Sequence, residues 1–226
     1  MFMSRCEINV SRRGARKLLG SPQAMHAAVM SCFPRSQAEQ AGRVLWRLDE
    51  IGGAKFLIVT SAMKPDLSVI EEQAGWHSAQ STQYKKYGPF LDRIATGQQY
   101  QFRLTANPTH SVRREGARSK RMPHVGRAHQ ERWLLERSEP NGFIIPDLPG
   151  DDGATPLGKA FSVTNRTTWH FRRNAERGRN VTVQSVSYEG VLEVADEDKF
   201  RDALINGIGS GKAYGCGLLT VVPLNK

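Results

Sequence analysis

Residues 2–10 alternate between two faces in a period of two, which is typical of a strand. Ser21 and Pro22 then have the residue types of a helix N-cap and a first helical position. A helix is therefore predicted from there to about Phe33, because Pro34 stops it. Within this helix, apolar residues recur at i, i+3, i+4 and i+7 and predict one buried face. They are Met25, Ala28, Val29 and Cys32.

The first half of the chain continues with further strand and helix patterns. The predicted strands are 43–51, 55–61 and 99–106, with Gly52-Gly53 as a hairpin turn, and the predicted short helix is 67–73. Residues 11–17 are expected to form a basic turn and residues 76–87 a polar loop. The order β-α-β-β-α-β predicts a ferredoxin-like domain over residues 1–106.

The second half begins where Asn107-Pro108 breaks the pattern. The elements predicted there are a basic stretch at 113–127, a helix at 128–137, a mobile loop at 146–158, strands at 166–171, 181–186, 187–194 and 218–222, and a helix at 197–206. A basic segment, 172–179, is expected to form the tip of a hairpin between the first two of these strands. The fold class is therefore α+β, with two tandem ferredoxin-like domains, the second (107–226) modified by a basic β-hairpin.

The excess of basic over acidic residues indicates the class of molecule that this protein binds. Lys and Arg number 32 against 22 Asp and Glu, which gives a formal net charge of +10 over 226 residues. Such a surplus favours a polyanion, with nucleic acid as the first candidate. No apolar run is long enough to span a membrane and the first residues lack a signal-peptide pattern, so a cytoplasmic protein without membrane partners is expected.

Cysteines and histidines do not form a metal-binding pattern. Three cysteines lie far apart, and no histidine has the i, i+4 partner and neighbouring Glu of a helical metal site. We expect neither a bound metal nor a cofactor.

Five glycines fall within eleven residues near the C-terminal end: Gly207, Gly209, Gly211, Gly215 and Gly217. Glycine is favoured where φ is positive or where a backbone approaches a ligand, so this glycine loop predicts a tight turn whose N–H groups suit phosphate. Lys212 lies beside them, either to contact a phosphate or to solubilise an exposed loop. The segment is not a nucleotide P-loop, which would need Gly in place of Asn206 and Ser or Thr in place of Ala213.

His26 is the candidate catalytic residue. It lies one position off the buried stripe, at the edge of the helix, and it is expected beside the glycine loop if the two domains pack side by side. An imidazole both accepts and donates protons near neutral pH. That chemistry serves RNA cleavage by 2′-hydroxyl attack. The alternative is a half-exposed helix histidine with no role.

Several segments together resemble the CasE family, the CRISPR RNA-processing endoribonucleases of the type I-E Cascade complex, within the repeat-associated RNA-binding superfamily. They are the opening strand, the helix with Ala24-Met25-His26 and Cys32-Phe33-Pro34, and residues 102–108, 188–192 and 207–219. The resemblance implies a metal-independent cut in the repeat stem-loop by a histidine of the first helix, which leaves a 2′,3′-cyclic phosphate and a 5′-hydroxyl. His26 matches that position. It also implies the repeat RNA and other Cascade subunits as partners, and a monomer when free.

One departure concerns Gln23, which stands where family members commonly carry a tyrosine one turn before the histidine. Glutamine forms hydrogen bonds but cannot act as a phenol, so Gln23 is a positioning candidate.

The candidate RNA-binding residues are basic residues in three stretches together with the glycine loop. They are Arg12, Arg13, Arg16, Lys17, Arg113, Arg114, Arg118, Lys120, Arg121, Arg127, Arg172, Arg173, Arg177, Arg179, Gly209, Gly211, Lys212, Gly215 and Gly217. The alternative for each basic stretch is a solvated face. Two other functions stay open: a non-catalytic RNA-holding subunit of the same complex, and a general basic RNA-binding protein without a CRISPR role.

Overall fold

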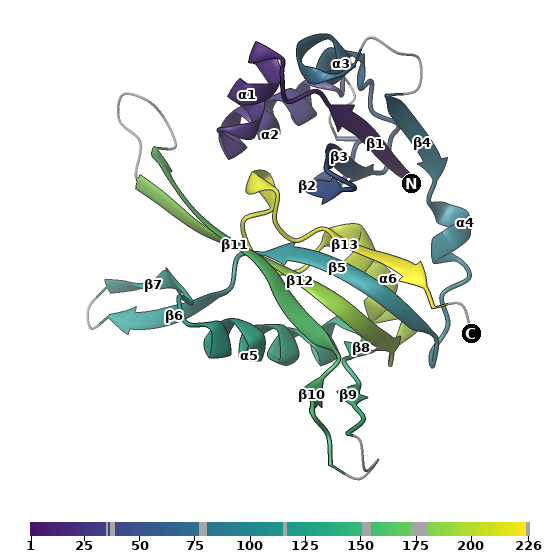
Figure 1. The fold of residues 1–226 in the computed structure, drawn as a ribbon, viewed down its shortest axis with the longest axis vertical. Helices are drawn as coiled ribbons and strands as arrows, with labels where there is room; N and C mark the ends of the chain where they lie inside the picture. The colour runs from purple at the N-terminus through teal and green to yellow at the C-terminus, as the bar shows by residue number, and fades with distance from the viewer. Residues whose placement is uncertain are drawn as a thin grey trace. The chain divides into compact units, whose positions relative to one another are not determined.

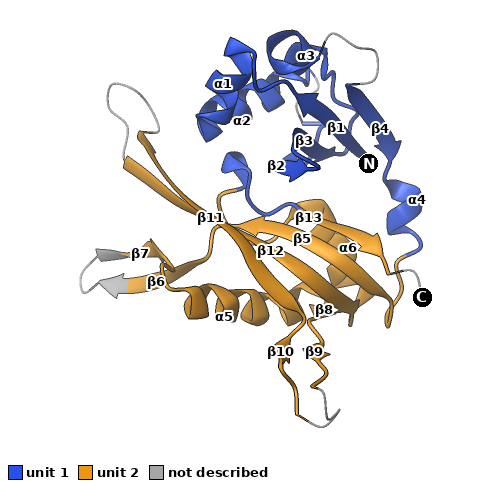
Figure 2. Cartoon of the chain, viewed as in Figure 1, with its two compact units in different colours: residues 1–93, 212–218 blue, residues 94–211, 219–226 orange. Residues whose placement is uncertain are grey.

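The computed structural model describes residues 1–34, 36, 39–76, 81–114, 117–150, 155–172 and 180–224, with only the backbone at 113, 114, 117 and 118. These residues form two compact units (Figure 2). Unit 1 comprises residues 1–93 and 212–218, and unit 2 comprises residues 94–211 and 219–226.

Unit 1 contains a four-stranded antiparallel sheet with the order β2-β3-β1-β4 (Figure 1). Its strands are β1 (Phe2–Ile8), β2 (Leu45–Ile51), β3 (Ala54–Ser61) and β4 (Thr82–Lys86). Its helices are α1 (Arg13–Leu19), α2 (Pro22–Ser31), α3 (Ser68–Ala74), α4 (Gly88–Leu91) and the 3-10 turn η3 (Lys212–Tyr214). The β-α-β-β-α-β order is present as β1, α2, β2, β3, α3 and β4, with β4 in the place predicted for the strand 99–106. Both glycines of the predicted hairpin turn, Gly52 and Gly53, have positive φ.

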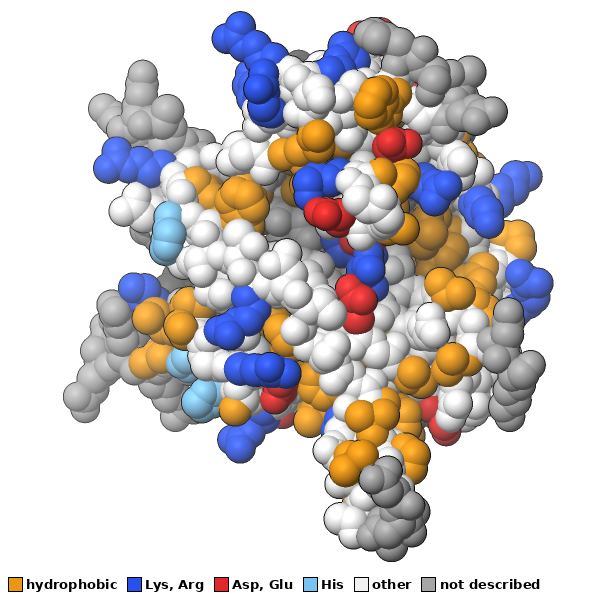
Figure 3. Space-filling model, viewed as in Figure 1, with side chains coloured by type: hydrophobic (Ala, Val, Ile, Leu, Met, Phe, Trp, Pro, Cys, Tyr) orange, Lys and Arg blue, Asp and Glu red, His pale blue; other side chains and the backbone are white. Residues whose placement is uncertain are grey.

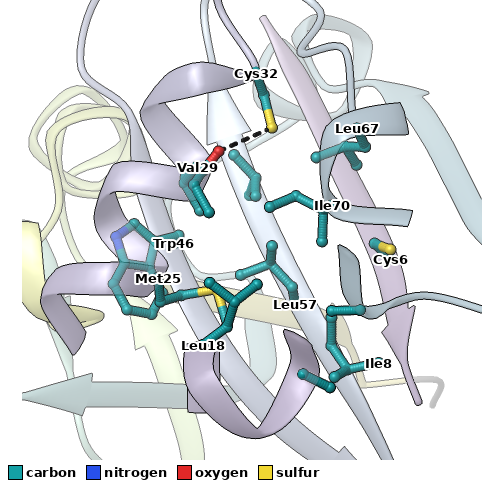
Figure 4. Close-up of a cluster of buried hydrophobic side chains, with 14 of the residues drawn as sticks. Cys6, Ile8, Leu18, Met25, Val29, Cys32, Trp46, Leu57, Leu67 and Ile70 are labelled. Atoms are coloured by element: carbon teal, nitrogen blue, oxygen red, sulfur yellow. Dashed lines mark hydrogen bonds between the residues drawn. The ribbon is translucent and has the colours of Figure 1, made fainter. Parts of the chain in front are cut away.

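Helix α2 is the best predicted element of this unit. The Ser21 hydroxyl accepts a hydrogen bond from the Ala24 N–H at 3.2 Å, and Pro22 is the first helical residue. All four residues of the predicted stripe are buried and belong to one apolar cluster with residues of β1, β3 and α3 (Figure 4). Burying a Met or Val side chain contributes about 1.5–3 kcal/mol, so this face holds α2 against the sheet.

Two segments that were expected to be a turn and a loop contain a helix and a strand. Residues 13–19 form helix α1 instead of a basic turn, because Ala15 and Leu18, one turn apart, are both buried. Residues 82–86 form β4 instead of part of a polar loop. β4 is largely exposed and pairs with β1 through its backbone, so it lacks the apolar alternation that marks a half-buried strand.

Unit 2 is built on a second antiparallel sheet, with the order β11-β12-β5-β13 and a short β8 paired to β12. Its strands are β5 (Gln99–Ala106), β8 (Phe143–Ile144), β11 (Phe161–Arg172), β12 (Asn180–Val194) and β13 (Leu219–Pro223). Its helices are α5 (Arg127–Ser138), α6 (Glu197–Asn206) and the 3-10 turn η2 (Glu139–Asn141). The strands β5, β11, β12 and β13 have the same order here as β1, β2, β3 and β4 have in unit 1. The protein is thus α+β with two tandem ferredoxin-like units.

Two small hairpins extend unit 2. The first joins β6 (Thr109–Arg114) to β7 (Ala117–Pro123), within and just before the predicted basic stretch. The second joins β9 (Asp147–Leu148) to β10 (Gly158–Lys159), within the segment expected as a mobile loop. The hairpin predicted around residues 172–179 is present, since β11 and β12 pair as far as Arg172 and Asn180.

Two predictions about the sheets were wrong. Strand β5 was assigned to the first domain, but it pairs with β12 and β13, and the boundary between the units falls between Arg93 and Ile94. Residues 187–194 are the continuation of β12 and not a separate strand. Apolar alternation identifies a strand, but it does not identify the strand with which it pairs.

Candidate functional site

His26 lies on α2 and faces an indole from β2. Trp46 Nε1 donates a hydrogen bond to His26 Nδ1 at 3.4 Å, which is long for a hydrogen bond. Since Nδ1 accepts, the neutral ring carries its proton on Nε2, a tautomer assigned from this geometry. His26 is half-buried, and burial lowers the pKa of its imidazole below the ordinary value. The ring is therefore neutral at pH 7 and presents an N–H at Nε2.

The glycine loop reaches the same site. All five of its glycines have positive φ, as predicted. Its residues 212–218 belong to unit 1, where η3 packs against both α2 and β2. The structure thus brings Lys212 to the helix that carries His26 and Gly215 to Trp46 on β2. The sequence predicted this proximity as a contact between domains, whereas this half of the loop is part of the first unit.

Gly215 lies directly against Trp46. Its φ is +77°, and a Cβ built on it would be 2.8 Å from Trp46 Cζ3. Gly209, in unit 2, has the same relationship to another indole, since its Cβ would be 2.9 Å from Trp133 Cζ2. Both positions require glycine for conformation and for space.

The buried guanidinium of Arg47 on β2 forms a hydrogen bond with the end of the glycine loop. Arg47 Nη1 donates to the Leu218 backbone oxygen at 2.8 Å, and its Nε and Nη2 donate to the two Asp49 oxygens at 2.6 and 2.8 Å. The side chains of Arg47 and Asp49 are 2% and 7% exposed. Sequence reasoning missed both residues, and also Trp46, because all three lie in a strand that was interpreted only as a strand.

Gln23 lies on α2 one turn before His26 and is half-buried. A helix places residues three positions apart on the same side, so the structure keeps Gln23 on the edge of α2 that His26 occupies.

Arg12 has a structural role. Its guanidinium donates to the backbone oxygens of Glu71 and Gly75 at 2.9 and 3.0 Å, and also to that of Glu72. These oxygens lie in the last turn of α3 and at its C-cap Gly75, and the Glu71 oxygen also accepts from the Gly75 N–H. The assignment of Arg12 to RNA binding therefore competes with a capping contact that occupies the same group. Arg13, Arg16 and Lys17 are exposed on α1, where Figure 3 shows basic side chains gathered.

The other basic candidates lie on β6, on β7, at the start of α5 and around the tip of the β11–β12 hairpin. Lys120 and Arg121 are exposed on β7, whereas Arg127 forms an ion pair with Glu131 at 2.7 Å. Arg172 is exposed at the end of β11, and its Nε lies 3.4 Å from Asn180 Oδ1. Arg113, Arg114 and Arg118 lie in β6 and β7 with side chains that are not described, and Arg173, Arg177 and Arg179 lie outside the described residues.

Three histidines stand in a row at the base of the β6–β7 hairpin. The ring centroid of His124 lies 4.6 Å from that of His110 and 5.8 Å from that of His129. Burial lowers the pKa of His124, and the charges of its two neighbours lower it further. The sequence showed only scattered histidines, because the row depends on the pairing of β6 with β7.

Within the described ranges, no group of three or more His, Cys, Asp or Glu side chains is arranged to hold a metal ion. Over the same residues, no helix combines the length and the apolar character that crossing a bilayer requires. Cys6, Cys32 and Cys216 are buried thiols, and burial raises the pKa of Cys6 to about 11 and of Cys32 to about 12.

Comparison with known proteins assigns the family. A family model described as CRISPR associated protein matches residues 1–223. The CRISPR-associated endoribonuclease Cse3 of Thermus thermophilus is 34% identical over 225 residues, covering 99% of this chain and 100% of the relative. The Cascade subunit CasE of Escherichia coli is 29% identical over 140 residues, covering 58% of this chain and 62% of the relative. A solved structure of Thermus thermophilus Cse3 bound to an RNA representing a pre-cleavage complex matches with a TM-score of 0.77 and 30% identity, covering 98% of each chain. This chain belongs to the CasE family of CRISPR-associated proteins.

Proposed function

We propose that this protein is an endoribonuclease that binds the stem-loop of CRISPR repeat RNA and cuts the precursor RNA once, with His26 as its proton-transfer group. The observation that carries the proposal is the arrangement around α2. A half-buried imidazole of lowered pKa faces Trp46, and the glycine loop with Lys212 packs against the same helix. Membership in the CasE family supports the choice of substrate.

The reaction needs no metal and no cofactor in this proposal. The 2′-hydroxyl next to the cut loses its proton and attacks phosphorus, the bond to the 5′-oxygen breaks, and that oxygen takes up a proton. The products are a 2′,3′-cyclic phosphate and a 5′-hydroxyl. His26 serves the proton transfers, for which a pKa near or below neutral is suited. Gln23 positions the reacting group from the same edge of the helix.

RNA binding uses exposed basic side chains and the glycine loop. Because the major groove of an A-form stem is too narrow for base reading, arginines and lysines contact phosphates and recognise the shape of the stem. Positive φ at Gly209, Gly211, Gly215 and Gly217 turns the loop tightly, so that its N–H groups and Lys212 suit a phosphate. The exposed residues of α1 and β7 supply further contacts.

The protein acts in the cytoplasm as a monomer when free and joins other Cascade subunits once loaded with RNA. The relative in Escherichia coli is named as a Cascade subunit, which supports this partnership. Three buried cysteine thiols fit a reducing compartment.

One observation favours a second function, a non-catalytic subunit that holds the RNA. Gln23 occupies the position of the tyrosine that the family commonly carries, and glutamine cannot act as a phenol. This alternative keeps the fold, the charge and the glycine loop but requires no chemistry at His26.

The test compares the parent protein with His26→Ala on the host's repeat hairpin and on an unrelated hairpin, under single-turnover conditions. The proposal expects cleavage of the repeat hairpin alone, with a rate about 10²–10⁴-fold lower in the variant and an affinity close to that of the parent. Equal cleavage by both proteins would contradict the role of His26. Tight binding without cleavage by the parent would establish the RNA-holding alternative.

A further inference from the structure

One indole contacts both the catalytic candidate and the glycine loop. Trp46 is 2% exposed and belongs to the apolar cluster of unit 1, so its ring is held by packing. Its Nε1 is directed to His26 Nδ1, and its six-membered ring lies against Gly215. Figure 4 shows Trp46 beside Met25, on the α2 side of the cluster.

We propose that Trp46 is a positioning residue for His26: its N–H keeps Nδ1 as an acceptor, so that Nε2 carries the proton and is the atom presented to RNA. This inference rests on the proposed function for its catalytic meaning. The contact itself does not depend on RNA.

The consequence for the imidazole follows from the donor atom. An indole nitrogen has a hydrogen and no available lone pair, so it can only donate. The tautomer with hydrogen on Nδ1, and the doubly protonated imidazolium, would each place two N–H groups face to face. Trp46 therefore disfavours both forms and acts in the same direction as burial, which lowers the pKa of His26.

Gly215 makes room for this indole. Its positive φ and the 2.8 Å approach to Cζ3 exclude a larger residue unless the ring moves. The glycine loop thus supports the catalytic candidate through packing, in addition to offering N–H groups to phosphate.

The proposal is tested on the full-length protein without RNA by nitrogen-15 NMR of the histidine rings, with His26 assigned from the His26→Ala variant. In the parent, His26 should show an acceptor-type Nδ1 and a protonated Nε2. Trp46→Phe keeps an aromatic ring but removes the donor, so it should mix the two tautomers and raise the pKa of His26. Trp133→Phe is the matched control, since it removes a buried indole of unit 2 and should leave His26 unchanged.

Other charges near the helix stay constant in these variants. The elements that pack against α2 carry Lys212 on η3, basic residues on α1 and acidic residues on α3. The basic residues are Arg13, Arg16 and Lys17, and the acidic residues are Glu71 and Glu72. A shift of the His26 titration in Trp46→Phe is therefore assigned to the missing donor.

A second pair of variants keeps the test decisive if Trp46→Phe fails to fold. Gly215→Ala should displace the Trp46 indole and change the His26 ring signals, whereas Gly209→Ala, with a similar positive φ, should press on Trp133 and leave them as in the parent. In cleavage, Trp46→Phe should lower the single-turnover rate by about two- to tenfold, the worth of one hydrogen bond, and move the acidic limb of the pH profile upward.

The two readouts separate this inference from the proposed function. A parent protein that does not cut RNA would contradict the proposed function. The NMR result would still test whether Trp46 sets the tautomer of His26, because it is measured without RNA. Unchanged His26 nitrogen signals in both Trp46→Phe and Gly215→Ala would overturn the inference. Changed signals with an unaltered pH profile of cleavage would overturn the positioning role.

Discussion

Arg47 on β2 donates from Nη1 to the backbone oxygen of Leu218 over 2.8 Å, although 171 positions separate the two residues in the chain. The same guanidinium pairs with Asp49, and both side chains are almost fully buried. This group therefore ties the end of the glycine loop to the strand that also carries Trp46.

Removal of Arg47 is expected to destabilise the protein strongly. Arg47→Met removes the guanidinium that pairs with the buried Asp49 carboxylate, at a cost of about 3–5 kcal/mol in the free energy of unfolding. Lys55→Met is the matched control, because the Lys55–Glu50 pair is exposed and contributes about 0–1 kcal/mol. Denaturant unfolding measures both. Equal effects of the two variants would show that the buried pair does not hold the loop.

Residues within a few positions of one another were enough to predict helix ends and the turn at the glycine loop. Ser21 and Pro22 marked the start of α2, and the helix predicted at 197–206 has the bounds of α6. The positive φ of the glycine loop was predictable for the same reason, since glycine identity alone signals that conformation.

Contacts between distant segments were not predictable in this way. β5 has a clear strand pattern, but its place between β12 and β13 depends on strands that lie far away in the sequence. The link between Trp46 and His26 likewise depends on how α2 packs over β2. His26 itself was identified from its place on the helix edge, whereas the residue that orients it gave no local signal.

The stability of the protein toward acid should depend on His26. Burial lowers its pKa in the folded state below 6.5, so the unfolded chain binds a proton there more readily. The contribution of neutral His26 to the free energy of unfolding is present above pH 6.5 and is lost as pH falls through that value. His26→Gln removes the titration, so its stability relative to the parent should improve between about pH 7.5 and about pH 5. A constant difference across that range would contradict a buried, neutral imidazole.

The exposed basic residues of β7 should contribute to RNA affinity by neutralising phosphates. Replacing Lys120 and Arg121 with alanine is expected to weaken hairpin binding and to reduce the slope of log K against log[salt] by roughly 0.7–0.9 for each phosphate that is no longer neutralised. Lys159→Ala on β10 removes a lysine that pairs with Asp147 at 2.9 Å and should leave the slope unchanged. If the β7 variant keeps the parent slope, these side chains face solvent in the complex.

The tautomer of His26 predicts which proton transfer it serves. With Nε2 carrying a hydrogen and Nδ1 accepting from Trp46, the neutral ring is set to donate a hydrogen bond to the 5′-oxygen and to stabilise its charge as that oxygen leaves. A substrate with sulfur in place of this oxygen needs no proton to leave, because a thiolate is a far weaker base than an alkoxide. Cleavage of the sulfur substrate should therefore change little in His26→Ala, while cleavage of the normal RNA slows about 10²–10⁴-fold. An equal decrease on both substrates would assign His26 to activation of the 2′-hydroxyl.

The most direct measurement is single-turnover cleavage of the repeat hairpin in EDTA, with and without one 2′-deoxy nucleotide immediately upstream of the cut. A metal-independent attack by the 2′-hydroxyl predicts full cleavage of the all-ribose RNA despite chelation, ending in a 2′,3′-cyclic phosphate, and no cleavage of the deoxy RNA, because the nucleophile is missing. Cleavage of the deoxy RNA, or the absence of all cleavage in EDTA, would contradict this mechanism and indicate a metal-activated water instead.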